Sequence, residues 1–557
     1  MRKMRWSVAT SGLAVFGALG WFVGCTTTES EILTTPGLGS NTKSTTSSSS
    51  TGGGGAPSTT SSTGTGIDPG CLGTITETLS SEDAKRLISD KCGVFAQAGA
   101  KGATEDGTQA APYKTLQKAI DNAGNRRVYS CSSAMKPFAE AVTVAAPVEV
   151  YGGFTCDKGW AFKDATRGVI TGSAKKVSLT LTDLAGGAIV EGFKITSASA
   201  TPMTGDSSVA VAIAAIDATL DKCDVEAGDG ADGVDGLPPM GNATNGMDAP
   251  VTDPQVISAC INPAALTFGA PGMTTCDDGL SSGGPGGKGG ISGTNNGYGQ
   301  AGSDGTPVDG TNGKGGTGQD NLAVCANGSS GKDGDPGAAG DAGKALGILS
   351  IAGITNTAGA DGTDGKPGAK AQGGGGGGGA KSSTLCPGSI DGPGASGGGG
   401  GAGGCGGKGG GAGKVGGSSI AVVSLGTKLV LTKVTLKSGQ GGTGGDGAAG
   451  QGGGILGAGG KGGVPSNVAG SKPGCKGGDG GMGGGGGPGG AGRGGHSIGL
   501  ASIGIPAAMP GMFTPGMPGN GGVAGTGGSP AGDGAKGVGG SKTAACWDFS
   551  KDMSCAK

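Results

Sequence analysis

The chain has 557 residues, of which 137 are glycine, about a quarter against a usual share of roughly 7%. Aromatic residues make up only 3%, and 40 basic residues nearly balance 42 acidic ones, giving a net charge of −2. This charge balance excludes nucleic acid as the main partner, since binding phosphates takes clustered Lys and Arg. Glycine is concentrated after residue 225, and it brings no side chain to a core. The second half therefore cannot form a conventional enzyme core.

Residues 1–24 resemble a lipoprotein-type signal peptide, with basic residues before a mostly apolar stretch. The stretch ends in Phe-Val-Gly-Cys at residues 22–25, which resembles the lipobox of bacterial lipoproteins. The resemblance implies that Cys25 carries lipid and becomes the mature N-terminus. Because Thr26 and not Asp follows it, the resemblance also implies an exported outer-membrane lipoprotein, held in the membrane by its lipid and exposed at the cell surface. Ordinary secretion with cleavage elsewhere is the alternative.

Residues 25–70 are Ser, Thr and Gly almost throughout, which predicts a flexible tether. With Cys25 lipidated, an odd number of the 14 cysteines remains. In an oxidising exterior most should pair, and one should be left over or join another chain. We expect two local disulfides, Cys71–Cys92 and Cys131–Cys156.

Residues 71–230 have ordinary composition and divide into a cap over 71–137 and short strands over 138–230. Pro at a first helical position and the one-face spacing of Tyr113, Leu116 and Ile120 predict a helix over 112–123. The period then changes to two and predicts short strands at 128–131, 142–144, 148–151, 168–171, 177–181 and 188–195. Strands of this length and spacing fit either a β-sandwich or a parallel β-helix.

The helix before the first strand resembles the N-terminal cap of pectate-lyase-like right-handed parallel β-helices, and residues 190–195 resemble their recurrent strand–Gly–strand rung. Residues 148–160, with Tyr-Gly-Gly-Phe and Cys156, resemble the opening of glycine-rich, β-helix-bearing surface lipoproteins of myxobacterial type, often labelled PGRS-family. The resemblance implies an all-β fold, a right-handed parallel β-helix with a short N-terminal capping helix. It covers residues 93–230 and says almost nothing about activity, because fold does not fix function.

A repeat recurs across the glycine-rich half. Residues 207–230 align without gaps with 418–441, and the first half of the unit recurs at 345–351 and 497–503. We therefore predict that residues 231–545 are glycine-rich excursions from the β-helix, with rungs returning near 345–354, 418–439 and 497–505. Isolated apolar patches in a disordered chain are the alternative.

The excursions carry glycine at every third position, for example from Gly474 to Gly495. Collagen needs that period with much more proline than the 27 residues present here. Packed extended threefold helices and mobile loops both fit the pattern. Residues 546–557 close the chain, and Cys546 and Cys555 predict a disulfide hairpin that covers the last rung or docks a partner.

Two motifs raise the question of chemistry. Residues 315–323 match the calcium-binding nonapeptide GGxGxDxUx, with Asp320 as the weak candidate ligand, but known sites use tandem copies and this copy is isolated. Asp217, Asp221 and Asp224 are the best carboxylates for cleaving a polysaccharide. Thr replaces the last two in the second repeat copy, so they read as solvent-facing rung positions.

The sequence thus predicts a non-catalytic, lipid-anchored cell-surface β-helix protein with a structural, adhesive or matrix-interacting role. We expect no catalytic residue, no cofactor and no metal, apart from the calcium alternative. The expected partners are the membrane, through the N-terminal lipid, and an extracellular polysaccharide or surface protein. A β-helix that binds or cleaves polysaccharide is the alternative function.

Overall fold

The structure is a computed structural model that separates into two units, Met1–Ser61 and Ser62–Lys557. It describes residues 67–102, 104–215, 217–250, 258–261, 267–355, 361–386, 390–425, 428–504, 511–529, 532, 534, 536, 539–540 and 542–555. The expected signal peptide, most of the tether, and Cys25 lie outside the described residues. Among the described residues, no helix has both the length and the apolar character that crossing a bilayer requires.

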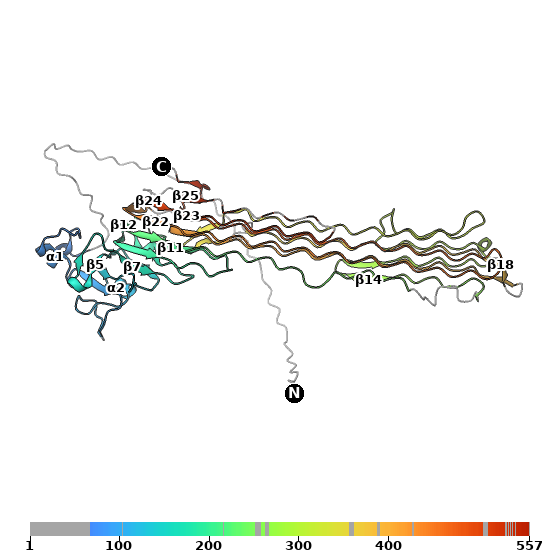
Figure 1. The fold of residues 1–557 in the computed structure, drawn as a ribbon, viewed down its shortest axis with the longest axis horizontal. Helices are drawn as coiled ribbons and strands as arrows, with labels where there is room; N and C mark the ends of the chain where they lie inside the picture. The colour runs from blue at the N-terminus through green and yellow to red at the C-terminus, as the bar shows by residue number, and fades with distance from the viewer. Residues whose placement is uncertain are drawn as a thin grey trace, which may run out of the picture. The chain divides into compact units, whose positions relative to one another are not determined.

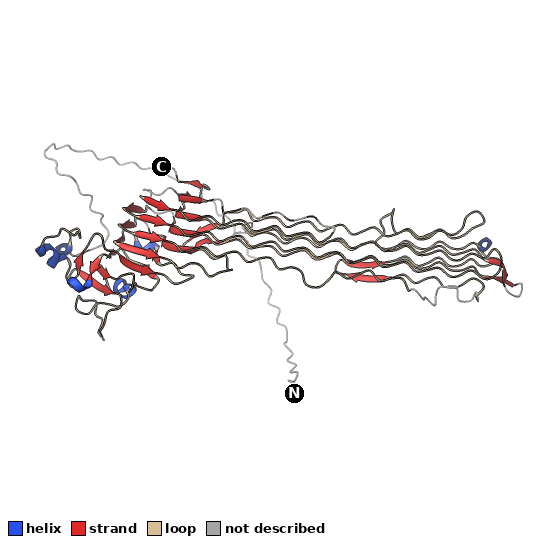
Figure 2. Cartoon of the chain, in the orientation of Figure 1, coloured by secondary structure: helices blue, strands red, loops and turns tan. Residues whose placement is uncertain are grey.

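Strands dominate the fold, and α-helices occur only in its N-terminal part among the described residues, whereas one short 3-10 turn lies near the far end of the glycine-rich segments (Figure 2). The first helices are η1 (Pro69–Cys71) and α1 (Ser81–Leu87). The sequence did not lead us to expect α1. It begins where the Ser80 hydroxyl accepts the N–H of Asp83, and it buries Leu87.

The predicted helix over 112–123 is shorter in the structure, where α2 spans Leu116–Asp121. Its N-cap is Thr115, whose hydroxyl accepts the N–H of Lys118, so Pro112 does not begin the helix. Tyr113 instead pairs in parallel with Ala96 of β1 (Gly93–Gln97), which holds this part of the chain extended. Leu116, Ala119 and Ile120 are buried, so the predicted apolar face is correct.

Three sheets of parallel strands lie between the N-terminal helices and the glycine-rich segments (Figure 1). One antiparallel pair, β25–β26, lies at an end of one sheet. In spatial order, the first sheet contains β1, β2 (Arg127–Cys131), β4 (Glu149–Tyr151), β9 (Ile189–Glu191), β12 (Thr219–Asp221) and β21 (Val430–Thr432). The second contains β24 (Met512–Thr514), β22 (Thr435–Lys437), β13 (Asp224–Glu226), β10 (Phe193–Thr196) and β7 (Gly168–Thr171). The third contains β26 (Met553–Ser554), β25 (Thr543–Asp548), β23 (Ser497–Ser502), β20 (Ser419–Ser424), β11 (Ser208–Ile213), β8 (Leu179–Leu181) and β3 (Val142–Val144).

From β8 onward the chain visits the third, first and second sheets in turn, and it repeats that order through β13 and again from β20 to β22. The side chains between the sheets form one apolar core. Core residues stack in register, as Val190, Leu220 and Leu431 do in the first sheet. We call this assembly the sheet stack.

The two copies of the sequence repeat are neighbours in the sheet stack. Ser208 pairs with Ser419 in the third sheet and Leu220 with Leu431 in the first, so each residue meets its own counterpart in the repeat. Residues 497–502 form β23, which pairs with β20. The predicted repeat therefore corresponds to adjacent, register-matched strands.

The expected rung at 345–354 was wrong. Ile348–Ser350 (β16) and Gly353–Thr355 (β17) form an antiparallel hairpin outside the three parallel sheets. Gly353, at φ 107, allows the chain to turn back directly, so β16 does not pair in parallel with the stack. Leu349 packs instead against the other face of the third sheet, with Val209 and Ile420.

The remaining strands and short helices are local. They are β5 (Phe154–Thr155), β6 (Ala161–Phe162), β14 (Met273–Cys276), β15 (Gly279–Ser282), β18 (Ser383–Cys386) and β19 (Ile390–Gly392), with 3-10 turns η2 (Cys156–Lys158), η3 (Asp183–Ala185) and η5 (Asn295–Gly297).

The glycine-rich excursions are ordered where the structure describes them. We call the described parts of residues 228–418, 438–496 and 515–540 the arm, and its segments run alongside one another (Figures 1 and 2). Every third N–H from Gly474 to Gly495 donates to residues 442–463, at 2.8–2.9 Å. The next register, from Cys475 to Gly490, donates to residues 363–378 at 2.7–3.0 Å. Of the two arrangements that the sequence left open, the structure therefore contains the packed threefold one.

Glycine at every third place is what permits this packing. A Cβ added to Gly480 would lie less than 3.0 Å from the carbonyl oxygen of Ala402, and most glycines of the arm would meet a neighbouring backbone in the same way. A chain with three residues per turn and no internal hydrogen bonds presents its N–H and C=O groups in three directions. Each segment of the arm can therefore form hydrogen bonds with neighbouring segments on several sides, whereas a strand in a β-sheet does so on only two.

The packed arm gives a test with adjacent residues. Gly453→Ala should destabilise the arm by about 1–3 kcal/mol or more, because the new methyl group would overlap the carbonyl oxygen of Gly483. Gly452→Ala is the matched control, since Gly452 is exposed and its added carbon would meet only the Ser529 oxygen, at 4.0 Å. Amide hydrogen exchange along the chain measures both. Equal protection of the arm in the two variants would contradict the close packing.

Candidate functional site

The structure pairs the cysteines that the sequence predicted to pair. Cys71–Cys92, Cys131–Cys156 and Cys546–Cys555 form disulfides, with Cα atoms 5.3, 5.9 and 5.3 Å apart. Three further disulfides, which the sequence did not identify, cross the arm: Cys260–Cys386, Cys276–Cys405 and Cys325–Cys475. Among the described cysteines Cys223 alone is free, and it is buried in the core. The one cysteine that was expected to remain without a disulfide partner is therefore Cys223, inside the core.

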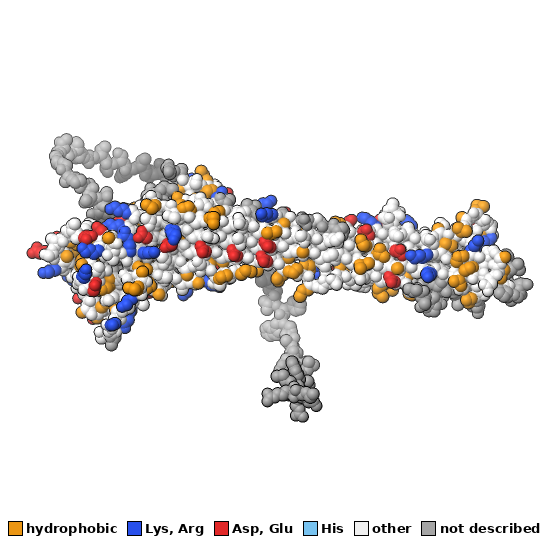
Figure 3. All heavy atoms as spheres, in the orientation of Figure 1, with side chains coloured by type: hydrophobic (Ala, Val, Ile, Leu, Met, Phe, Trp, Pro, Cys, Tyr) orange, Lys and Arg blue, Asp and Glu red, His pale blue; other side chains and the backbone are white. Residues whose placement is uncertain are grey.

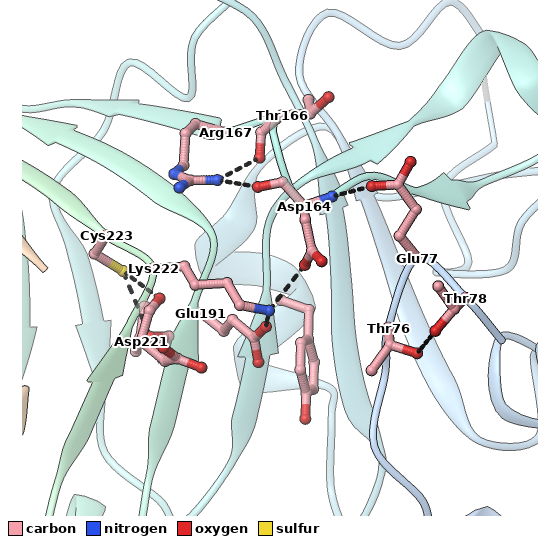
Figure 4. A network of polar contacts seen from close by, with 12 residues as sticks. Thr76, Glu77, Thr78, Asp164, Thr166, Arg167, Glu191, Asp221, Lys222 and Cys223 are labelled. Atoms are coloured by element: carbon pink, nitrogen blue, oxygen red, sulfur yellow. Dashed lines mark hydrogen bonds and ion pairs between the residues drawn. The ribbon is translucent and has the colours of Figure 1, made fainter. Parts of the chain in front are cut away.

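An ionic cluster lies at the corner between β12 and β13 (Figure 4). Lys222 occupies this corner in a left-handed conformation, at φ 48, and points its ammonium group at two carboxylates. Its Nζ is 2.9 Å from Glu191 Oε1 and 2.8 Å from Asp164 Oδ1. Glu77 extends the cluster by accepting the N–H of Asp164 at 3.2 Å.

The burial of these groups sets their ionisation. Burial raises the pKa of Glu191 above its ordinary value, and the bond from Lys222 acts against that rise. Burial also disfavours the charge on Lys222, but hydrogen bonds to Asp164 and Glu191 outweigh it and raise the Lys222 pKa. The cluster therefore ties the loop that carries Asp164 to the corner of the stack.

The three predicted carboxylates do not converge on a substrate site. Asp217 is exposed and 3.8 Å from Lys428, whereas Asp221 ends β12 in the first sheet. Asp224 begins β13 in the second sheet, where its Oδ1 accepts the Thr435 hydroxyl at 2.5 Å. Asp221 does pair in register with Glu191. That pair, which sequence reasoning missed, depends on which strands become neighbours.

A cavity of about 360 Å³ lies beside the ionic cluster, lined in part by Glu77, Trp160 and Phe162. The aromatic rings there are already packed. Trp160 is only 5% exposed, its ring contacts Phe95 at 4.7 Å between centroids, and its N–H points to the Gln109 carbonyl. The indole therefore serves the core and presents little face to a sugar.

The Asp320 carboxylate is engaged in its own turn. Its Oδ1 accepts the N–H groups of Leu322 and Ala323, both at 2.7 Å. These bonds lower the Asp320 pKa, with the bond from Ala323 contributing most. In the part of the chain that the structure describes, no group of three His, Cys, Asp or Glu side chains is arranged to hold a metal ion.

The arm presents two kinds of side chain along its first segment. Asp229, Asp232 and Asp235 accept N–H groups of the neighbouring segment at 2.7–2.8 Å, which satisfies its backbone at the edge. Val234 and Leu237, also three residues apart, are 40% and 81% exposed. Apolar side chains are visible along the arm, interspersed with uncharged surface and with acidic and basic side chains (Figure 3).

A larger hollow lies on the arm. Its volume is about 580 Å³, and its lining combines apolar residues such as Met240 and Pro367 with polar ones, which are Asn242, Thr244, Thr275, Asp277, Asp278, Lys408 and Gln451. The Cys276–Cys405 disulfide forms part of its wall. Amide, hydroxyl and carboxylate groups of this kind bind the hydroxyl groups of polar ligands.

No protein-family model, no curated protein and no solved structure matches this chain. The functional argument therefore rests on the geometry of the sheet stack, the arm and their surfaces.

The ionic cluster gives a matched pair of variants. Lys222→Met should lower the free energy of unfolding by about 2 kcal/mol, because it leaves Glu191 charged and without its ion-pair partner. The loss should be smaller than the ~3–5 kcal/mol that breaking a fully buried ion pair costs. Lys433 occupies the same corner in the second repeat copy, at φ 52, and is exposed. Lys433→Met should therefore change stability by less than about 0.5 kcal/mol.

Urea unfolding at pH 7 and pH 4 measures both variants. The loss in Lys222→Met should shrink at the lower pH, because Glu191, whose pKa is already raised, takes up a proton and no longer needs a partner. Equal losses for the two lysines would show that Lys222 stabilises nothing through its ion pairs.

Proposed function

We propose that the three sheets are the faces of a right-handed parallel β-helix, and that the chain is a non-catalytic, lipid-anchored surface protein whose arm serves adhesion or matrix contact. The cyclic passage of the chain through the three sheets supports the β-helix, since each return adds a strand beside its predecessor. Parallel crossovers within a sheet are right-handed in nearly all proteins, which supports the hand.

The observation that carries the proposal is the hydrogen-bonded arm. Its segments hold one another through backbone groups at every third residue, without a conventional apolar core. Such an arm leaves rows of side chains exposed, among them Val234 and Leu237. An enzyme needs an active-site pocket in which reactive groups converge. The arm instead offers extended rows of acidic and apolar side chains.

Two features support the proposed export and anchoring: the disulfides and the segment at residues 22–25. The six disulfides among the described residues favour an oxidising compartment outside the cytosol. Residues 22–25 resemble a lipobox, as in the glycine-rich PGRS-labelled surface lipoproteins that residues 148–160 resemble. We propose the outer membrane, with Cys25 lipidated, as the location.

Binding of an extracellular polysaccharide is the second candidate function. The hollow of about 580 Å³ on the arm favours it, because the amides, hydroxyls and charged groups in its lining match the hydrogen-bonding groups of a sugar chain. Incubating the secreted 71–557 fragment with uronate polymers, with and without calcium, separates binding from cleavage. Turnover that is lost in Asp221→Asn would favour a polysaccharide-cleaving enzyme over the proposed adhesive role.

Anchoring and display are tested in one experiment. Cells that express the full chain are labelled with radioactive palmitate and treated with external protease. The wild type should incorporate label and be cleaved from outside, while Cys25→Ser should lose the label and enter the medium, since a lipid supplies the membrane affinity.

Two outcomes of that experiment would contradict the proposal: label retained in Cys25→Ser, or a wild type that external protease cannot reach. Adhesion of the same cells to matrix-coated surfaces completes it. Gly453→Ala should weaken adhesion, whereas the control Gly452→Ala should not.

A further inference from the structure

A column of polar side chains lies where the arm enters the third sheet. Consecutive strands place Ser207, Ser418, His496 and Lys542 at one register, each just before its strand begins. The Ser418 N–H donates to Ser207 Oγ at 3.1 Å, and the His496 N–H donates to Ser418 Oγ at 2.9 Å. Histidine thus stands at the place where both copies of the sequence repeat have serine.

Arg493 precedes His496 by one turn of the arm, and both side chains are buried, at 3% and 2% exposed. Arg493 Nη1 donates to the Ala345 carbonyl, beside the β16–β17 hairpin, at 3.0 Å. Arg493 Nε and His496 Nδ1 are buried without a hydrogen-bond partner. None of the ion pairs among the described residues includes Arg493.

A small cavity of about 10 Å³ is lined by both of these residues. Its walls include Arg493, His496, Ser207 and Ser418, and Leu346 and Ile354 of the hairpin region close it. This is about the room that a single water molecule needs. The cavity therefore has room for a single small occupant, a water molecule or a monatomic ion, and not for a polyatomic ligand.

Two positive charges act on His496, that of Arg493 in the cavity wall and that of Lys542. Lys542 lies 4.0 Å from the centroid of the Trp547 ring. Burial, then Arg493 and Lys542, lower the pKa of His496 to about 3, so the imidazole is neutral at pH 7. Asp552 is the acidic group that acts on Arg493, and it does so without a hydrogen bond or ion pair. A buried guanidinium with no counter-charge in contact is costly.

We propose that this cavity is a binding site for one chloride-sized anion, held by Arg493 Nε–H and by Nδ1–H of neutral His496. An anion accepts from both donors and supplies the missing negative charge, whereas a water molecule would supply only the hydrogen bonds. The anion fastens the root of the arm, because the same guanidinium holds the hairpin through the Ala345 carbonyl.

The test is thermal unfolding of the mature chain in sodium chloride and in sodium methanesulfonate at equal ionic strength. Methanesulfonate is too large for the cavity and controls for screening. Each tenfold rise in chloride above its Kd should stabilise the folded wild type by a tenfold shift of the unfolding equilibrium. Arg493→Gln should abolish the difference between the salts, whereas Lys433→Met, which removes an exposed cation of the stack, should keep it.

Equal unfolding of the wild type in the two salts would overturn the proposal, because the linkage persists even when the site is saturated. A crystal grown in bromide gives a readout that does not depend on the variant folding. An anomalous peak between Arg493 and His496 is the expected result. Density for a water without anomalous signal would show that the cavity holds solvent only.

Discussion

The backbone hydrogen bond between segments of the arm, repeated at every third residue, is the constraint on which the rest of the structure depends. It requires backbones to approach so closely that a Cβ at Gly480 or Gly483 would overlap a carbonyl oxygen of the neighbour. Glycine costs conformational entropy on folding, and here that cost is offset by groups that pair on several sides. The high glycine content and the scarcity of aromatic residues in the arm follow from this one geometry.

The same hydrogen-bond register continues from the arm into the sheet stack. Residues 398–416 donate to the segment 475–493, and the next bond in the series is Ser419 to His496, where β20 and β23 begin. The acidic row follows the repeat in the same way, since Asp229 and Asp232 bind residues 211 positions later. Beyond Gly241 the separation becomes 210. The arm therefore accommodates a one-residue shift that a half-buried strand would not tolerate.

Sequence reasoning succeeded where apolar residues alternate and fill one core. The strands at 142–144 and 168–171 were predicted with their observed bounds, and the ungapped repeat identified strands that become neighbours. It failed where a polar or local contact determines where an element begins or which strand it pairs with. Thr115 sets the start of α2, and Gly353 turns an apolar unit into a hairpin. The pairing of Cys325 with Cys475 depends on which glycine-rich segments lie together, and a period of three is common to them all.

The first part of the arm, within residues 228–418, lies between β13 and β20, and this position also bears on how the chain folds. These strands belong to adjacent repeat copies, yet the residues that pair are 211 apart in sequence. Such a separation makes the contact order high and loop closure slow. Because the arm pairs its own outgoing and returning segments, it can close progressively from one bond to the next and bring β20 back beside β11. Folding of the second repeat copy is then coupled to the stepwise pairing of the arm. The glycine residues that permit this pairing therefore also determine the pathway by which the chain folds.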